Sequence, residues 1–235
     1  MEIKEYTLSL WDDFVKLIYP AYCLACEQSL VKGEETICTN CRATLPRTHF
    51  HLDPVNPVAT RFYGLTPIER VLPYLHFSRK GIVQKLLHQL KYKKHPEIGQ
   101  ILGKIYGYEL HKAGVLTDID LIIPVPLHPL KQKQRGYNQA MAFAEGLSEA
   151  TGLPITEEGL VRTRYTETQT KKGKASRWQN VNEVFHVDPV PLLQGKHVLL
   201  VDDVVTTGAT ASVCAQKLLD AGSQKVSLAF IAAGR

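Results

Sequence analysis

The chain of 235 residues lacks a long apolar run: no stretch of about eighteen apolar residues occurs, so we expect no transmembrane helix. Its first residues carry acids among the apolar ones and no basic leading segment, unlike a secretory signal. We therefore expect a cytoplasmic protein without membrane insertion, in a compartment where disulfides are rare. With 16 glycines and 13 prolines, no internal repeat and no low-complexity tract, the sequence favours folded domains over disorder.

Aromatic residues are sparse where positive charge is dense. The net charge of +5 is concentrated in residues 79–95, which contain no acid, and in residues 162–180, where Glu167 is the one acid. Such stretches attract phosphate, on a small molecule or on nucleic acid, or they form a solvated basic surface. Because their few aromatics are scattered, they do not resemble a platform on which bases stack.

The patterns divide the chain into a small N-terminal module, residues 1–50, and a larger domain, residues 51–235. Residues 1–20 have a helical apolar face that Pro20 ends, and a short cysteine-rich segment follows. The remainder alternates helical and strand patterns, which predicts an α/β fold with a mostly parallel sheet and flanking helices. We expect strands within 71–77, 118–126, 196–204 and 225–233, and helices within 80–92, 97–113, 136–152 and 208–222.

Two CxxC pairs lie in the N-terminal module, Cys23 with Cys26 and Cys38 with Cys41. Two residues between thiolates let one tight turn present both sulfurs to one ion, and four thiolates in a tetrahedron select zinc. A redox dithiol, a disulfide and an iron–sulfur cluster are the alternatives. Because a segment of this size has little core of its own, a structural Zn²⁺ is the favoured interpretation.

The stretch VLLVDDVVTTGAT, residues 198–210, places two acids at the end of a buried strand, followed by a loop of small residues. In open α/β sheets, ligands bind at the carboxyl ends of the strands. Asp202 and Asp203 would there accept hydrogen bonds from ribose hydroxyls or face Mg²⁺. The loop from Thr206 leads into a helix, whose N-terminal N–H groups favour a phosphate. Together these features predict a ribose 5-phosphate pocket, whereas helix capping alone explains just one Asp or Thr.

This stretch resembles the phosphoribosyl pyrophosphate signature of type I phosphoribosyltransferases. The resemblance implies a Rossmann-like phosphoribosyltransferase domain in which Asp202 and Asp203 contact the ribose directly or through metal-bound water. It also implies a binding site for phosphoribosyl pyrophosphate with the following residues: Asp202, Asp203, Val204, Thr206, Thr207, Gly208, Ala209 and Thr210.

Three further segments narrow the resemblance to the ComF family: PVPLHPLKQKQRGYNQA at 124–140, LHQLKYKK at 87–94, and TETQTKKGKASRWQNVNEVF at 166–185. Paired CxxC knuckles also belong to that family. The first segment follows a predicted strand, and the resemblance implies that it holds the pyrophosphate group through the residues Val125, Pro126, Leu127, His128 and Arg135. His128 is either a phosphate ligand or a turn residue, and Lys91 and Lys93 either reach phosphate or are solvated.

The basic stretch of residues 162–180, which overlaps the third segment, is expected to be either a mobile hood that closes over the substrate or a solvated connection. Its candidate residues are Gln169, Lys171, Lys172, Arg177 and Asn180.

The function implied is that of a phosphoribosyltransferase-like protein that binds phosphoribosyl pyrophosphate with Mg²⁺. If it is an enzyme, it is a pentosyl (glycosyl) transferase whose acceptor the sequence does not name. Family membership implies a part in DNA uptake during natural transformation, with single-stranded DNA and competence helicase-type proteins as partners. The alternative is an accessory module on the same fold that senses phosphoribosyl pyrophosphate or handles single-stranded DNA without turnover.

Overall fold

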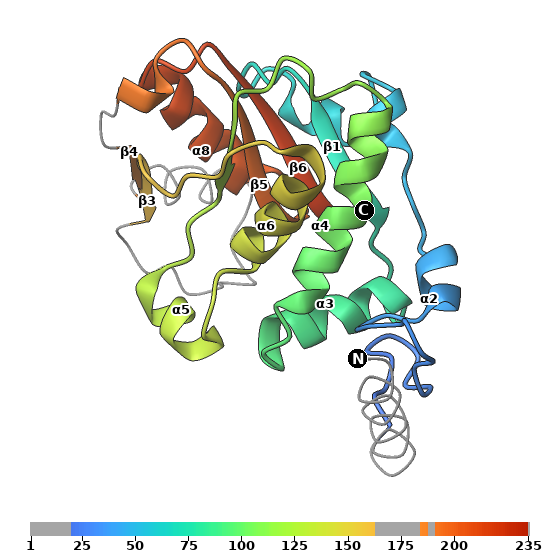
Figure 1. Ribbon diagram of the computed structural model, residues 1–235. Coiled ribbons are helices and arrows are strands. Elements are labelled where there is room, and N and C mark those ends of the chain that lie inside the picture. The colour runs from blue at the N-terminus through green and yellow to red at the C-terminus, as the bar shows by residue number, and fades with distance from the viewer. Residues whose placement is uncertain (1–19, 163–183, 188–190, 235) are drawn as a thin grey trace, which may run out of the picture. The chain divides into compact units, whose positions relative to one another are not determined.

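The computed structural model describes residues 20–162, 184–187 and 191–234. Its chain forms two compact units, residues 1–45 and residues 46–235 (Figure 1). The helix expected within residues 1–20 and the hood residues lie outside the described residues. The expected domain boundary after residue 50 stays a prediction.

The larger unit is built on a parallel four-stranded sheet, as predicted. Its strands, in spatial order, are β1 (Val71–His76), β6 (Lys225–Ala233), β5 (His197–Val205) and β2 (Leu121–Pro124). Both central strands are almost entirely buried, which explains why their sequences are continuous apolar runs without alternation. Because the four strands are parallel, their carboxyl ends lie at the same edge of the sheet.

Helices cover both faces of this sheet, as the sequence predicted. On one face lie α4 (Glu97–Lys112) and α6 (Gln139–Thr151), and on the other lies α8 (Ala209–Asp220) (Figure 1). Helix α3 (Ile82–Tyr92) packs against α4. On β5, Val198 and Leu200 belong to the same buried cluster as Val213 and Leu218 of α8. Side chains alternate along a strand, so Leu199 and Val201 of β5 face the α4–α6 layer.

Helices α4 and α6 pack closely because glycines line their contact. A Cβ added at Gly103 would lie 2.2 Å from the carbonyl oxygen of Phe143, and one at Gly146 would lie 2.0 Å from that of Gln100. No side chain fits at either position, so the two backbones approach each other directly. The four-residue spacing of glycines in GQILGKIYG was the signal of this packing in the sequence.

Short elements that the sequence did not predict lie around the sheet. They are α5 (Pro129–Arg135), the antiparallel pair β3 (Leu160–Arg162) and β4 (Phe185–Val187), and the 3₁₀ turns η1 (Phe50–Leu52), η2 (Ala59–Phe62) and η3 (Pro191–Leu193). The sequence PLKQKQR of α5 has no apolar face, and no residue of α5 is buried. Periodicity therefore gave no indication of this helix.

The smaller unit has little regular structure in its described part. It contains α2 (Thr39–Ala43) and one antiparallel bridge between Tyr22 and Ser29. No helix within the described ranges of either unit is long and apolar enough to cross a membrane.

Candidate functional site

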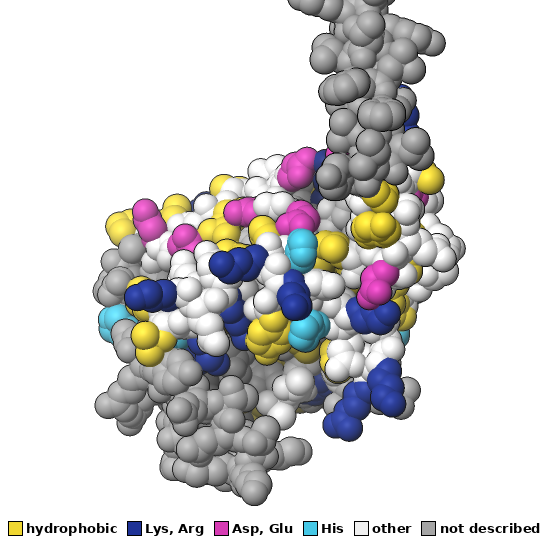
Figure 2. Space-filling view, turned by 90° about the horizontal axis from the view of Figure 1, so that it is seen from below, with side chains coloured by type: hydrophobic (Ala, Val, Ile, Leu, Met, Phe, Trp, Pro, Cys, Tyr) yellow, Lys and Arg dark blue, Asp and Glu magenta, His cyan; other side chains and the backbone are white. Residues whose placement is uncertain are grey.

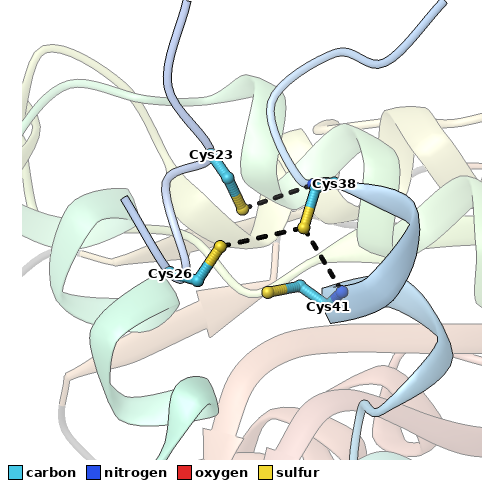
Figure 3. A group of neighbouring side chains, drawn as sticks. All are labelled: Cys23, Cys26, Cys38 and Cys41. Carbon is cyan, nitrogen blue, oxygen red and sulfur yellow. Dashed lines mark hydrogen bonds between the residues drawn. The ribbon is translucent and has the colours of Figure 1, made fainter. Parts of the chain in front are cut away.

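The four cysteines of the smaller unit converge, as Figure 3 shows. Their sulfur atoms all lie within 4.8 Å of one another, and the Sγ atoms of Cys26 and Cys38 are 3.8 Å apart (Figure 3). Zinc–sulfur bonds of about 2.3 Å in a tetrahedron place sulfurs about 3.8 Å apart. The cysteines form no disulfide, since all are free thiols in the structure. The cluster therefore fits a structural zinc ion, and four ligands leave no open position for catalysis.

Backbone N–H groups favour the charged form of the Cys23 sulfur, whereas burial raises the pKa of the Cys41 thiol. The Sγ of Cys23 accepts hydrogen bonds from the N–H groups of Ala25, at 3.4 Å, and Cys38, at 3.3 Å. Burial opposes ionisation of Cys23, but hydrogen bonds from Cys38, Cys26 and Ala25 outweigh it and lower the pKa of this thiol to about 7. Zinc binds cysteine as the thiolate, so the lowered pKa of Cys23 favours metal binding.

The candidate ligand site of the larger unit lies at the carboxyl edge of the sheet. Pairing of β2 with β5 ends at Val201, whereas pairing of β5 with β6 continues to Val205. Asp202 and Asp203 therefore lie within β5, beside the point where its neighbour β2 stops. Burial and then the charge of Asp203 raise the pKa of Asp202 to about 7, although the Asp203 N–H donates to its carboxylate at 2.8 Å.

The loop after β5 turns sharply into α8. Gly208, the N-cap of α8, has φ +80°, and a Cβ there would lie 2.9 Å from ring atoms of Phe62. Glycine is therefore required by both the backbone conformation and the packing. Arg61, also in η2, donates to the carbonyl oxygens of Thr206 and Gly234, each at 2.6 Å, and so fixes the start of the loop.

A small hollow of about 60 Å³ lies between the loop and the strand end. Among the described residues its lining includes Asp202 but not Asp203, together with the following residues: Val204, Val205, Thr206, Thr207, Gly208, Ala209, Thr210, Ala211 and Phe230. All the sequence-predicted residues of this loop are thus brought together at the N-terminus of α8. The Asp202 side chain and the loop at the N-terminus of α8 thus line one small cavity, and a helix N-terminus favours an anion.

Asp203 points to the other face of the sheet. Its Oδ2 lies 2.8 Å from Nζ of Lys91, near the end of α3, and the side chains of Asp203 and Lys91 are 16% and 23% exposed. The sequence allowed two roles for Lys91, a contact with phosphate or a solvated side chain. In the structure Lys91 instead forms an ion pair with Asp203. No local pattern could have predicted this pair, because the partners belong to distant elements.

The segment after β2 is organised by the side chains of the RGYNQ sequence. Asn138 caps α6 by accepting from the N–H of Ala140 and donates to the carbonyl oxygen of Val125 at 3.0 Å. Tyr137 donates to the carbonyl oxygen of Leu90 at the end of α3. These hydrogen bonds connect the end of β2, α3 and α6. The polar side chains of the motif are therefore used to join these elements, and Gln139 is buried among them.

His128 and Arg135 begin and end α5. Nδ1 of His128 accepts from the N–H of Leu130 at 3.1 Å, so His128 is a helix N-cap, the turn role that the sequence allowed. Arg135 donates to Oε1 of Gln139 at 2.6 Å and lies over the ring of Tyr92, 5.7 Å from its centroid. Val125, Pro126 and Leu127 connect β2 to this helix at the same edge of the sheet as β5.

Two further cations belong to elements near this edge: Lys131, which the sequence did not point to, and Arg162, the first residue of the stretch expected to form a hood. Burial lowers the pKa of Lys131, and so do the nearby charges of Arg162, Arg135 and Lys91, whereas Asp203 raises it. Burial likewise lowers the pKa of Arg162, and the charge of Asp202 raises it. Positive side chains of α3, α5 and β3 therefore act electrostatically on the acid pair, and Lys91 contacts it directly.

Comparison with protein-family models matches both parts of the chain. Residues 14–51 match a double zinc ribbon domain, and residues 137–235 match a phosphoribosyl transferase domain. These matches agree with the cysteine cluster and with the parallel sheet.

Comparison with curated proteins finds relatives over nearly the whole chain. The chain is 32% identical to the DNA utilization protein YhgH of Escherichia coli K12, covering 90% of this chain and 96% of that protein. It is 25% identical to the competence protein ComFC of Bacillus subtilis, covering 87% and 91%. Among solved structures, the glutamine phosphoribosylpyrophosphate amidotransferase of B. subtilis has a TM-score of 0.42 at 24% identity, covering 61% of this chain and 30% of that one. With a zinc ribbon ahead of a phosphoribosyltransferase domain and with these relatives, the chain belongs to the ComF family.

Proposed function

We propose that the larger unit binds phosphoribosyl pyrophosphate with Mg²⁺ at the carboxyl edge of its sheet. The observation that carries this proposal is the shared hollow, in which the Asp202 carboxylate faces the loop Thr206–Thr210 at the start of α8. A ribose offers hydroxyl donors to a carboxylate, and its 5-phosphate accepts from loop N–H groups. Carboxylate oxygens are also the ligands that Mg²⁺ prefers, so the acid pair suits the ion or its water shell.

In a transfer reaction, these residues would act by position and charge rather than by covalent chemistry. Asp202 and the loop would fix the ribose at two points, which holds its C1 atom in one place. The bond from C1 to the pyrophosphate oxygen would break with its electron pair on the leaving group, and a nucleophile of the acceptor would form the new bond to C1. Cations at the site edge would stabilise the charge of the leaving pyrophosphate. Mg²⁺, when bound, would neutralise further negative charge.

A thermal-shift panel tests this proposal. Zinc-loaded protein is heated with phosphoribosyl pyrophosphate, ribose 5-phosphate or ATP, each with and without Mg²⁺, since a ligand that binds only the folded state raises the melting temperature. We expect the largest shift with phosphoribosyl pyrophosphate plus Mg²⁺, a smaller one with ribose 5-phosphate, and loss of both in Asp202→Asn. Equal shifts with ATP would indicate a general anion site and contradict the proposal.

We also propose that the protein acts in DNA uptake during natural transformation, because its relatives carry the names DNA utilization protein and competence protein. A second role, handling of single-stranded DNA, is supported by the face seen in Figure 2, where Lys, Arg and His side chains gather across the middle and many acids lie toward one margin. The test is the salt dependence of binding to a fluorescent single-stranded oligonucleotide. A steep fall of affinity with salt supports the role, and no binding at low salt contradicts it.

A further inference from the structure

The segment of residues 59–66, which contains η2, contacts the loop between β5 and α8 at three points. The first contact is made by Arg61, whose two terminal nitrogens donate to the carbonyl oxygens of Thr206 and Gly234, each at 2.6 Å. Gly234 follows β6, and its N–H donates to the carbonyl oxygen of Val205 at 2.9 Å. One guanidinium group therefore joins the ends of the two central strands at the place where the loop begins.

The other two contacts lie further along the loop. A ring atom of Phe62 would lie 2.9 Å from a Cβ added at Gly208, so the ring packs directly against the turn. Thr66 donates through Oγ1 to the carbonyl oxygen of Ser212, in the first turn of α8, at 3.2 Å. Because Phe62 and Thr66 are both buried, close packing holds these contacts in place.

The same segment is anchored to β1 by the side chain of Asn56, which is 1% exposed. Its Oδ1 accepts from the N–H groups of Val58 and Ala59, at 3.1 and 3.0 Å. Its Nδ2 donates to the carbonyl oxygen of Val71, the first residue of β1, at 3.0 Å. Buried hydrogen bonds of this kind are costly to break. A firm connection therefore runs from β1 through residues 59–66 to the loop.

The bond from Arg61 to Thr206 also sets the direction of the next N–H group of the loop. In a trans peptide the C=O and the N–H point to opposite sides, so the N–H of Thr207 points away from Arg61. Thr207 lines the hollow beside α8, and Arg61 is not part of that lining. Arg61 is thus placed to orient a hydrogen-bond donor of the loop without touching a ligand in the hollow.

The charge of Arg61 is not neutralised by these contacts, because both acceptors are carbonyl groups. Burial lowers the pKa of Arg61, and among the described residues no acid raises it. A positive charge without an acidic partner beside the loop favours an anion there. The geometry and the charge of this residue therefore act in the same direction.

We propose that Arg61 is a positioning residue that sets the affinity of the loop for a phosphate group. It holds the peptide between Thr206 and Thr207 in one orientation before the ligand arrives, so that binding does not have to order the loop. This inference rests on the proposed function, and it names a residue outside the hollow on which the same site depends.

Calorimetric titration with ribose 5-phosphate into zinc-loaded protein tests the role of Arg61. Arg61→Met keeps the length of the side chain but removes its donors, and we expect about tenfold weaker binding. Arg61→Lys should bind about threefold more weakly than wild type, because one ammonium group lacks the fork that reaches two carbonyl oxygens.

Arg70→Met is the matched control. Arg70 also joins two segments, since it donates to Oδ1 of Asp118 at 2.6 Å and to the carbonyl oxygen of Val115 at 3.2 Å. It precedes β1 and so lies at the amino edge of the sheet, away from the loop. Its loss should lower the melting temperature but change the affinity for ribose 5-phosphate less than about twofold.

Nuclear magnetic resonance gives a readout that a merely structural role would not change. In ligand-free Arg61→Met, the amide signals of Thr207 and Gly208 should be displaced or broadened, because the loop then samples several orientations. In Arg70→Met, these two signals should stay where they are in wild type. Arg61→Lys should restore them in part.

Two results would overturn the inference alone: wild-type affinity for ribose 5-phosphate in folded Arg61→Met, or equal losses of affinity in Arg61→Met and Arg70→Met. Circular dichroism shows whether each variant is folded. If Arg61→Met does not fold, Arg61→Lys decides, and unchanged affinity in that variant overturns the inference. Failure of folded wild type to bind ribose 5-phosphate and phosphoribosyl pyrophosphate would instead overturn the proposed function, so the two failures are distinguished.

Discussion

Asp202 and Asp203 are neighbours along β5, yet their side chains serve opposite faces of the sheet: Asp202 lines the hollow beside α8, and Asp203 pairs with Lys91 of α3 at 2.8 Å. Adjacent residues of a strand point in opposite directions, and accordingly Asp202 lines the hollow whereas Asp203 does not. The two acids are adjacent in the sequence, but their side chains lie in different surroundings and are expected to have different roles.

This division predicts different effects of two isosteric substitutions on the binding of ribose 5-phosphate. Asp202→Asn should weaken binding by tenfold or more, because it removes the charged acceptor for the sugar hydroxyls within the hollow. Asp203→Asn should change it less than about threefold. Equilibrium dialysis with labelled ribose 5-phosphate measures both, and equal losses in the two variants would contradict the division.

Substitution of Gly208 should damage both stability and ligand binding. Gly208→Ala adds a Cβ at positive φ, which costs about 1 kcal/mol, and presses it against Phe62, which costs about 1–3 kcal/mol more. Gly114→Ala is the control, since Gly114 has φ +68° but no atom within 4 Å of the added Cβ. Urea denaturation should show a clearly larger loss of unfolding free energy at Gly208. Equal losses at the two positions would mean that the Phe62 contact contributes nothing.

Removal of one thiol should release the metal from the smaller unit. Cys41→Ser should reduce zinc from about one ion per chain to almost none and should expose residues 20–45 to proteolysis, because metal binding contributes on the order of 10 kcal/mol to such modules. Cys214→Ala, which changes the buried cysteine of α8, should keep its zinc. Elemental analysis decides the outcome, and iron in the wild-type protein or full zinc in Cys41→Ser would contradict a four-cysteine zinc site.

A buried histidine should make the fold sensitive to mild acid. Burial lowers the pKa of His197 below its usual value, while Asp118 and Glu69 raise it and Arg70 lowers it; its Nε2 lies 2.9 Å from Oγ of Ser227. The unfolded chain then takes up a proton more readily than the folded one, so stability is lost as the pH falls below about 6.5. The fall in unfolding free energy from pH 7.5 to 5.5 should be larger in wild type than in His197→Gln. Identical falls would exclude a contribution from His197.

The sequence predicted the features that depend on local order along the chain. The apolar run of β5, the periodicity of α3 and the spacing of the four cysteines each have a physical cause within a short window, and the structure confirms all three. Short elements without such a cause, α5 and the β3–β4 pair, were not predicted.

The parts of the site that the sequence missed are contacts between distant segments. Lys91 reaches Asp203 because the fold brings the end of α3 near the end of β5, and Arg61 holds Thr206 because η2 lies beside the loop. Neither Lys91 nor Arg61 stands in a sequence pattern that marks it. A lysine in a basic stretch is expected to be solvated, and an arginine near a turn is expected to lie on the surface. Only the three-dimensional arrangement separates these residues from their exposed neighbours.

The central claim is that one pocket at the carboxyl edge of the sheet binds phosphoribosyl pyrophosphate. Its most direct test is calorimetric titration of this compound with Mg²⁺ into zinc-loaded protein, alongside Asp202→Asn and the control Gly114→Ala. The account predicts one site per chain with a micromolar dissociation constant, lost in Asp202→Asn and kept in Gly114→Ala. Absence of heat with folded wild-type protein, or equal affinity in Asp202→Asn, would contradict it.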